Sequence, residues 1–277
     1  MSGSRINNAS HSAQGQFTYA VSIQLLSPEN QVQETRGHMC GGALFTLSHV
    51  VTTAHCILRE IDNVPQPIPA LRVFAGSVDL TNDTSPDLVR AVSTVSVHPR
   101  YTGPPAFVND IAVLTLASAF PASAATPLNL PSANFNPPDF TLCTITGWGG
   151  AAIGQNSSSV QRYTEKYIYN QNLCMTIYNK IPLAKNILPS MVCAVSLDII
   201  TTNCEGDLGN ALVCAGTFTG VLSRSDDCQA SSLPEIYTRV SNHTAWLRQI
   251  SGSSAVYAPG VFVLMAVFSL MQVFIKA

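Results

Sequence analysis

His55 and Asp110 are of residue types that carry out acid–base chemistry. His55 ends the run Thr-Thr-Ala-His, and Asp110 opens the run Asp-Ile-Ala-Val-Leu. An imidazole can take the proton of an attacking hydroxyl group and later give it to a leaving amine, and a carboxylate can fix the imidazole tautomer and stabilise its charged form. A third segment, residues 206–210, reads Gly-Asp-Leu-Gly-Asn. Its central Leu208 has no proton to lose and no lone pair with which to attack a carbonyl carbon.

These segments resemble those of the trypsin-like serine proteases, the peptidase S1 family. The nucleophile loop of that family reads G-D-S-G-G-P-L-V-C, and Leu208 stands at the serine. The resemblance identifies His55 as the general base and Asp110 as the carboxylate that orients it. The order His, Asp, nucleophile is that of the chymotrypsin family among unrelated triads. Two more family landmarks follow in order, Gly-Trp-Gly at residues 147–149 and Pro-Glu-Ile-Tyr-Thr-Arg-Val at residues 234–240.

The resemblance implies an all-β fold of two six-stranded antiparallel β-barrels with the active-site cleft between them. His55 and Asp110 would belong to the first barrel, and Leu208 to the second. The pattern of the chain agrees, because short alternating segments separated by Gly, Pro and Asn favour barrels or sandwiches. Such segments lie at residues 21–26, 71–75, 89–97, 141–146 and 217–222.

Two helices are expected beside the barrels. A short intermediate helix is expected near residues 170–178, and a C-terminal helix at residues 241–250. In the C-terminal helix we expect Ser241 to cap the first turn, and Trp246 with Ile250 to form an apolar stripe.

The lining of the expected cleft departs from the family pattern at several positions. Arg224 and Ser225 replace the tryptophan and glycine that line the family's cleft, and Thr202 stands where trypsin-like enzymes place the aspartate that binds Lys or Arg. Glu235 replaces a pocket-wall glycine, so we expect its side chain to intrude where a substrate side chain would enter. We interpret these concordant changes as a degenerate specificity pocket; ordinary drift of variable loops is the alternative.

The nucleophile loop itself has also changed, while part of the family's machinery persists. Asn210 replaces the second loop glycine, and Ala211 replaces the proline after it. The backbone N–H groups of Gly206 and Leu208 can still supply donors of the kind that bind an oxyanion.

An activation cleavage is also expected from the resemblance. In active relatives, cleavage frees an amine that pairs with the aspartate of the nucleophile loop. Arg5 and Ile6 lie at the corresponding place, so Arg5–Ile6 is the expected activation bond and Asp207 the expected partner of the new amino terminus. The Asn7 and Asn8 that follow depart from the family's I-V-G-G pattern.

The eight cysteines of the chain are even in number. The resemblance implies the disulfides Cys40–Cys56, Cys143–Cys214, Cys174–Cys193 and Cys204–Cys228, a choice that spacing alone does not make among the possible pairings. The chain has no C-x-x-C pair or Cys/His cluster, so we expect no metal site, and no cofactor is expected. Disulfides require an oxidising compartment. N-x-S/T sequons, which accept N-glycans, occur at Asn8, Asn82, Asn156 and Asn242. We favour glycosylation at Asn82 and Asn156, which lie in polar, turn-rich stretches, over Asn242, which opens an expected helix.

The composition favours an extracellular protein that does not bind nucleic acid. The formal net charge is −2 and the basic residues are scattered, which argues against a nucleic-acid partner. Charged residues make up 11% of the chain, well below the usual quarter or so.

We divide the chain into residues 1–5, a leader or propeptide remnant; residues 6–250, the protease-like domain; and residues 251–277, a small-residue spacer with an apolar tail. The tail resembles a glycosylphosphatidylinositol attachment signal; a tail anchor or a merely appended apolar peptide are the alternatives. Residues 1–20 lack the apolar core of a signal peptide. We therefore expect a leader outside this sequence, the alternative being a cytosolic product from another start site.

The preferred functional hypothesis is a catalytically inactive serine protease homologue that acts extracellularly by binding a protein, either an active serine protease or its substrate. Removal of the serine from a triad costs on the order of a millionfold in turnover. The alternative is a residual or active serine-type endopeptidase, in which His55 and Asp110 activate water. Rescue by a neighbouring hydroxyl, such as that of Thr202 or Ser223, is less favoured, because neither stands at the nucleophile position. Nothing specific supports a lectin-like or structural role.

Overall fold

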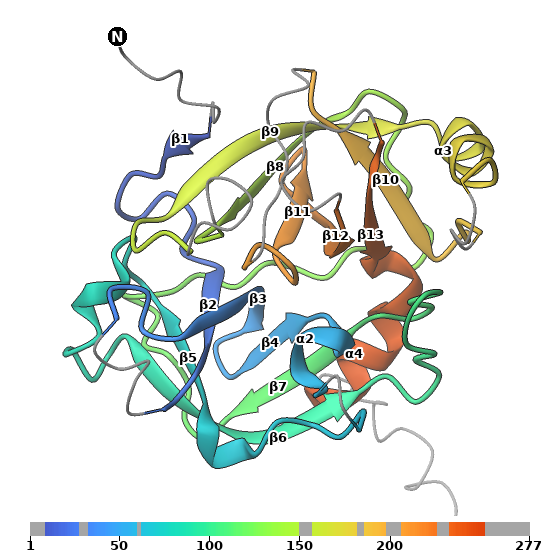
Figure 1. Cartoon of the computed structure of the whole chain (residues 1–277). Coiled ribbons are helices and arrows are strands. Elements are labelled where there is room, and N and C mark those ends of the chain that lie inside the picture. The colour runs from blue at the N-terminus through green and yellow to red at the C-terminus, as the bar shows by residue number, and fades with distance from the viewer. Residues whose placement is uncertain are drawn as a thin grey trace, which may run out of the picture.

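The computed structural model describes residues 9–27, 33–59, 62–149, 157–181, 186–197, 206–225 and 233–252. Its strands form two closed antiparallel barrels, as expected, which lie one below the other in Figure 1. The first barrel closes in the order β2-β3-β4-β7-β6-β5. Its strands are β2 (Ala20–Leu25), β3 (His38–Thr46), β4 (His49–Thr52), β5 (Leu71–Ala75), β6 (Val89–Val97) and β7 (Ala112–Leu116).

The second barrel closes in the order β9-β10-β13-β12-β11-β8 through the pairing of β8 with β9, and β1 (Ser10–His11) pairs with the other edge of β9. Its six strands are β8 (Leu142–Gly147), β9 (Arg162–Tyr169), β10 (Met191–Val195), β11 (Ala211–Cys214), β12 (Thr217–Arg224) and β13 (Glu235–Arg239). Inward and outward side chains alternate along these strands, as in β9, where Lys166 and Ile168 are buried.

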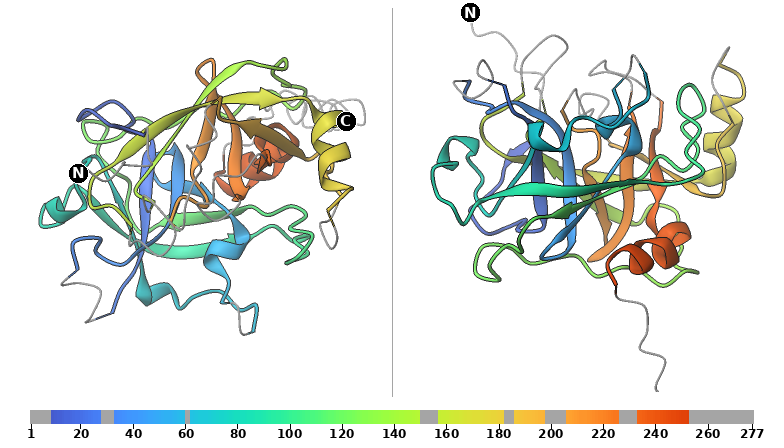
Figure 2. Two further views of the ribbon diagram at one scale, coloured as in Figure 1. Left: turned by 45° about the horizontal axis from the view of Figure 1, so that its top comes forward. Right: turned by 90° about the horizontal axis from the view of Figure 1, so that it is seen from below.

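Three α-helices and three 3₁₀ turns accompany the barrels in the described residues. The helices are α2 (Ala54–Ile57), α3 (Gln171–Tyr178) and α4 (Thr244–Ile250), and the 3₁₀ turns are η1 (Ile68–Ala70), η2 (Leu80–Asn82) and η3 (Val240–His243). Helix α3 confirms the expected intermediate helix, and the side chain of Asn170 caps it by accepting bonds from two backbone N–H groups. Figure 2 shows α3 and α4 on the outside of the strands.

The C-terminal helix begins later than expected. Residues Val240–His243 form the tighter turn η3, and α4 begins at Thr244 without a side-chain cap. The prediction that Ser241 caps the first turn is therefore wrong, because Ser241 lies buried inside η3. The apolar stripe is confirmed, since Trp246 and Ile250 pack with Leu247 on a buried cluster.

That cluster joins the two barrels. It combines Val51 and Val113 of the first barrel with Phe218 and Val221 of the second. Burial of apolar side chains from both barrels in one core fixes the barrels against each other. The cleft residues that follow are therefore held on a rigid frame.

Disulfides connect loops to this frame. Three of the expected pairs form, Cys40–Cys56, Cys143–Cys214 and Cys174–Cys193. Cys204 and Cys228 lie outside the described residues. No helix in the described ranges is long and apolar enough to cross a membrane.

Candidate active-site cleft

His55 and Asp110 form the centre of the cleft. His55 lies on α2, directly after β4, and Asp110 directly before β7, so the pairing of β4 with β7 brings the two residues together. The backbone N–H of His55 donates to Asp110 Oδ1 over 3.0 Å, and its Nδ1 donates to Oδ2 over 2.6 Å. This double contact fixes the tautomer and the orientation of the imidazole, as the resemblance implied.

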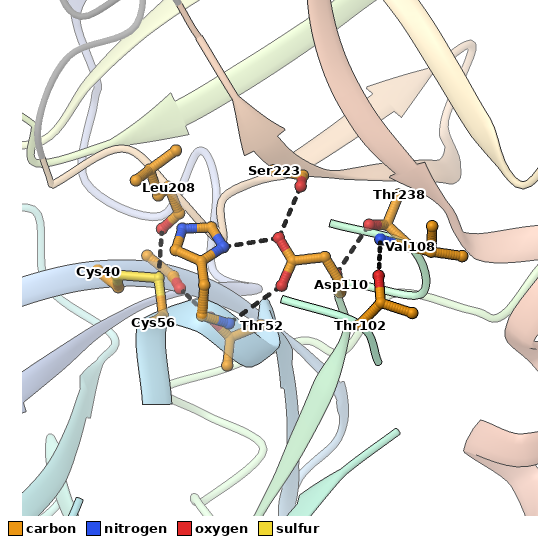
Figure 3. A network of polar contacts seen from close by, with 11 residues as sticks. Cys40, Thr52, Cys56, Thr102, Val108, Asp110, Leu208, Ser223 and Thr238 are labelled. Carbon is orange, nitrogen blue, oxygen red and sulfur yellow. Dashed lines mark hydrogen bonds and ion pairs between the residues drawn. A yellow bond between two sulfur atoms is a disulfide. The ribbon is translucent and has the colours of Figure 1, made fainter. Parts of the chain in front are cut away.

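Residues of the second barrel complete the environment of Asp110 (Figure 3). The Ser223 hydroxyl donates to Asp110 Oδ2 over 2.6 Å, and the Thr238 hydroxyl donates to the Asp110 carbonyl over 2.7 Å. Asp110 has no exposed surface. A buried carboxylate needs such donors, so both barrels contribute to holding the charge that orients His55.

Leu208 lies close to the helix that carries His55: its carbonyl oxygen is 3.6 Å from the Sγ of Cys56, the residue after His55 (Figure 3). It is partly buried and packs against the apolar cores of both barrels. The loop around it is held by two backbone bonds, from Gly41 N to the Leu208 carbonyl and from Gly209 N to the Leu222 carbonyl, each 2.8 Å long. The structure therefore brings together His55, Asp110 and the position that Leu208 occupies.

Asn210 and Asp207 explain the Gly-Trp-Gly landmark. The Asn210 side chain is fully buried and donates through Nδ2 to Asp207 Oδ1, which also accepts the backbone N–H of Gly149. A Cβ at Gly147 would overlap the Asn210 amide, and one at Gly149 would overlap the Asp207 carboxylate. Both glycines are thus required by close packing against the loop that carries Leu208.

His38 ties the same loop to the first barrel. Its Nε2 donates to the Gly206 carbonyl over 2.9 Å, and its Nδ1 accepts from the Ser22 hydroxyl over 2.7 Å. Burial lowers the pKa of His38 to about 4, so the ring is neutral at physiological pH. Sequence reasoning missed His38, because nothing in its local pattern separates it from an ordinary strand residue.

The two expected oxyanion donors are present in the loop. No hydrogen bond to any residue that the structure describes uses the backbone N–H of Gly206 or of Leu208. Gly206 has a φ of 91°, a left-handed value that glycine adopts readily. The role of these two N–H groups as donors to an oxyanion stays a prediction.

Glu235 turns toward the interior of the second barrel. Its carboxylate accepts from Lys166 Nζ over 2.8 Å and from the Tyr237 hydroxyl over 2.7 Å. Lys166 and Glu235 are both buried, with 1% and 6% of their surface exposed. Lys166 lies two residues before the buried Ile168 on β9, and this spacing is the sequence signal that its side chain points inward. Obstruction of a side-chain pocket by Glu235 stays a prediction.

Arg224 is the last residue of β12 and lies next to Ser223. Its guanidinium lies 5.8 Å from the ring centroid of Phe107 and 6.0 Å from that of Tyr178. Burial lowers its pKa, while Tyr178 and Asp110 act in the opposite direction. Ser225 follows at the edge of the described residues and is partly buried.

Several expected site residues lie outside the described residues. These are Arg5, Ile6, Asn8, Asn156, Thr202, Cys204 and Cys228, so the activation bond and the Thr202 substitution stay predictions. Asn82 and Asn242 are both exposed, and glycosylation at either stays a prediction. In the part of the chain that the structure covers, no cluster of His, Cys, Asp and Glu is able to hold a metal ion.

Comparison with known proteins places the geometry in context. The chain matches the family model "Trypsin" over residues 6–247. Trypsin delta of Drosophila erecta is 30% identical over 229 residues, which cover 82% of this chain and 85% of that protein. Human granzyme M is 32% identical over 228 residues, which cover 81% and 84%.

Solved structures agree. Human heparin binding protein has a TM-score of 0.72 and 26% identity, and the match covers 90% of this chain and 98% of that one. Neuropsin, a serine protease expressed in the limbic system of mouse brain, has a TM-score of 0.71 at 24% identity over 88% of this chain and 99% of that one, and shows the same fold.

Proposed function

The chain belongs to the trypsin family, and from that premise we propose that it is a catalytically inactive member that acts by binding a protein in its cleft. The partner is an active serine protease or a substrate of one. The setting is extracellular, and the three disulfides of the described residues support this. Residues 251–277 would contain a glycosylphosphatidylinositol attachment signal, whose apolar tail is removed when the lipid anchor is added.

The observation that carries this proposal is the neighbourhood of Leu208. His55 is oriented by Asp110 in the way that proton transfer from a nucleophile requires, yet the side chain beside it is an alkyl group. A hydroxyl at this position attacks the scissile carbonyl and passes its proton to the imidazole. Leucine offers neither the attacking oxygen nor the proton, so the general base has no nucleophile to activate.

Residual hydrolysis is the competing function, and the retained groups define it. His55 would take a proton from a water molecule, and the backbone N–H groups of Gly206 and Leu208 would stabilise the oxyanion. A water molecule lacks the fixed position of a side-chain nucleophile, and positioning accounts for a large part of the rate. Any such turnover is therefore expected to be orders of magnitude below that of active relatives.

Incubation of the purified protein with a peptide library, followed by mass spectrometry, tests the proposal. The matched control is His55→Ala, which removes the only proton acceptor of the mechanism and leaves the loop of Leu208 in place. We expect the same absence of cleavage products from both proteins. Cleavage by the wild type that His55→Ala abolishes would establish hydrolysis, whereas equal cleavage by both would indicate a contaminating protease.

A further inference from the structure

Arg224 places a positive charge where the two barrels meet. Its guanidinium contacts the ring of Phe107, in the loop before β7 of the first barrel, and the ring of Tyr178, at the end of α3 beside the second barrel. Aromatic faces attract a guanidinium and shield it from water. The two rings thus hold a cation in a defined place between the halves of the molecule.

The hydrogen-bonding capacity of this cation is largely unused. A guanidinium has five N–H donors. Among the residues that the structure describes, buried Arg224 Nε has no hydrogen-bond partner, and Nη2 contacts only the weak acceptor Met191 Sδ over 3.7 Å. No carboxylate of the described residues forms an ion pair with Arg224. A partly buried charge without an acceptor is unfavourable, so a ligand that supplies one gains from it.

Arg224 and His55 both lie against the ring of Phe107. The ring of Phe107, which contacts the guanidinium, meets the His55 imidazole edge to face with their centroids 5.4 Å apart. The neighbouring Ser223 donates to Asp110. The Asp110 carboxylate is fully buried and already accepts three hydrogen bonds, two from His55 and one from Ser223. It favours the charged form of Arg224 but does not occupy its donors.

We propose that Arg224 is a carboxylate-binding site, and that the peptide segment bound in this cleft presents an acidic group to it. The group is an Asp or Glu side chain or a C-terminal carboxylate, which a planar guanidinium recognises through paired N–H donors. This inference rests on the proposed binding function and names the chemistry of the partner. We expect acidic rather than basic peptides to be selected. Glu235 is already neutralised by Lys166, so it offers no equivalent site for a basic side chain.

Retention of peptides on the immobilised, full-length protein tests this inference. Three tetrapeptide libraries with an acetylated amino terminus are compared: amides with one position fixed as Asp or Glu, amides with that position fixed as Asn or Gln, and neutral sequences with a free C-terminal carboxylate. The first library reports side-chain recognition and the third reports recognition of a chain terminus. The second differs from the first only in charge.

We expect one of the two carboxylate libraries to be retained roughly 10- to 100-fold more strongly than the amide library, the range of a hydrogen bond to a charged group. Arg224→Gln abolishes that preference. The matched control Arg248→Gln, at an exposed position of α4, retains it. Equal retention of all three libraries, a preference that survives Arg224→Gln, or no retention at about 1 mM peptide would overturn the inference.

The same incubations separate this inference from the proposed function. Cleaved peptides that disappear with His55→Ala would refute inactivity, whatever the effect of Arg224. Intact peptides without a charge preference would refute the carboxylate site alone. Circular dichroism of Arg224→Gln shows whether the variant is folded. Arg224→Lys provides a second test, because lysine keeps the positive charge but lacks the paired N–H donors of the guanidinium. The preference for carboxylate peptides is therefore expected to fall in this variant without disappearing.

Discussion

The two halves of the cleft differ in what they have kept. On the side of the first barrel, His55 and Asp110 have the orientation and the donors that proton transfer requires. On the side of the second barrel, Leu208 presents hydrocarbon, Arg224 presents a cation that has no ion-pair partner among the described residues, and Glu235 turns inward to Lys166. The proposed function therefore combines a preserved His–Asp pair with an opposite wall that does not serve catalysis.

This difference shows why a preserved pair is weak evidence of activity. Asp110 is buried, and its carboxylate accepts from His55 on the side of the first barrel and from Ser223 of the second. Loss of one of these donors leaves the buried charge with fewer hydrogen bonds, which costs stability whether or not the protein is an enzyme. The position of the family's serine does not need a polar side chain for stability, because Leu208 packs there against the cores of both barrels.

The largest expected effect concerns the buried pair of the second barrel. Lys166→Met leaves the Glu235 carboxylate buried without its cation, and we expect the free energy of unfolding to fall by about 3–5 kcal/mol. The control is the double variant Lys166→Met/Glu235→Leu, which removes both charges and should recover most of the loss. Urea unfolding measures both. A double variant no more stable than the single one would show that the pair is not the cause.

A second variant tests the structural role of the first-barrel pair. Ser223→Ala removes one donor from the buried Asp110 carboxylate, and we expect a loss of about 2–3 kcal/mol, the upper range for a hydrogen bond to a charged group. The matched control is Ser93→Ala, whose exposed hydroxyl donates to the neutral Thr115 carbonyl, with a change of about 0.5 kcal/mol or less. Equal losses in both variants would contradict a structural role for the charge of Asp110.

A third prediction concerns acid. Burial lowers the pKa of His38 in the folded protein to about 4. In the unfolded chain the same imidazole takes up a proton near pH 6.5. The contribution of neutral His38 to the free energy of unfolding is complete above pH 6.5 and is lost as the pH falls toward 4. For His38 alone we expect a loss of ~2 kcal/mol between pH 7 and pH 5.

His38→Gln keeps one donor and one acceptor but does not titrate. The difference in unfolding free energy between pH 7 and pH 5 should shrink by that amount in this variant. The buried His98 and His243, whose pKa values are also lowered by burial, contribute with the same sign and remain in the variant. An unchanged difference would mean that His38 titrates normally in the folded protein.

Much of the fold and part of the site could be predicted from the sequence. Strand positions followed from alternation, and residues 71–75 and 89–97 agree with β5 and β6. The pairing of His55 with Asp110 followed from motifs in family order. Such motifs are local in sequence, so they can be read without knowledge of the fold.

Three features could not be predicted in this way, because they depend on contacts between distant segments. Lys166 meets Glu235 across 69 positions of the chain, and His38 meets Gly206 across 168. Ser241 was expected to cap a helix, but the preceding turn is wound more tightly and the cap falls inside it. Residue type gives no sign of such a change in winding, which is set by packing between the barrels.

The reversion Leu208→Ser bears most directly on the central claim, that the second-barrel wall has lost the chemistry which the first-barrel pair retains. Hydrolysis of a mixed peptide library is measured for the wild type, Leu208→Ser and Leu208→Ser/His55→Ala. We predict no turnover by the wild type and little or none by the reverted protein, because Arg224 and Ser225 still line the cleft. Wild-type or singly reverted protein with a kcat/KM of about 10⁴ M⁻¹s⁻¹ or more, abolished by loss of His55, would contradict that claim.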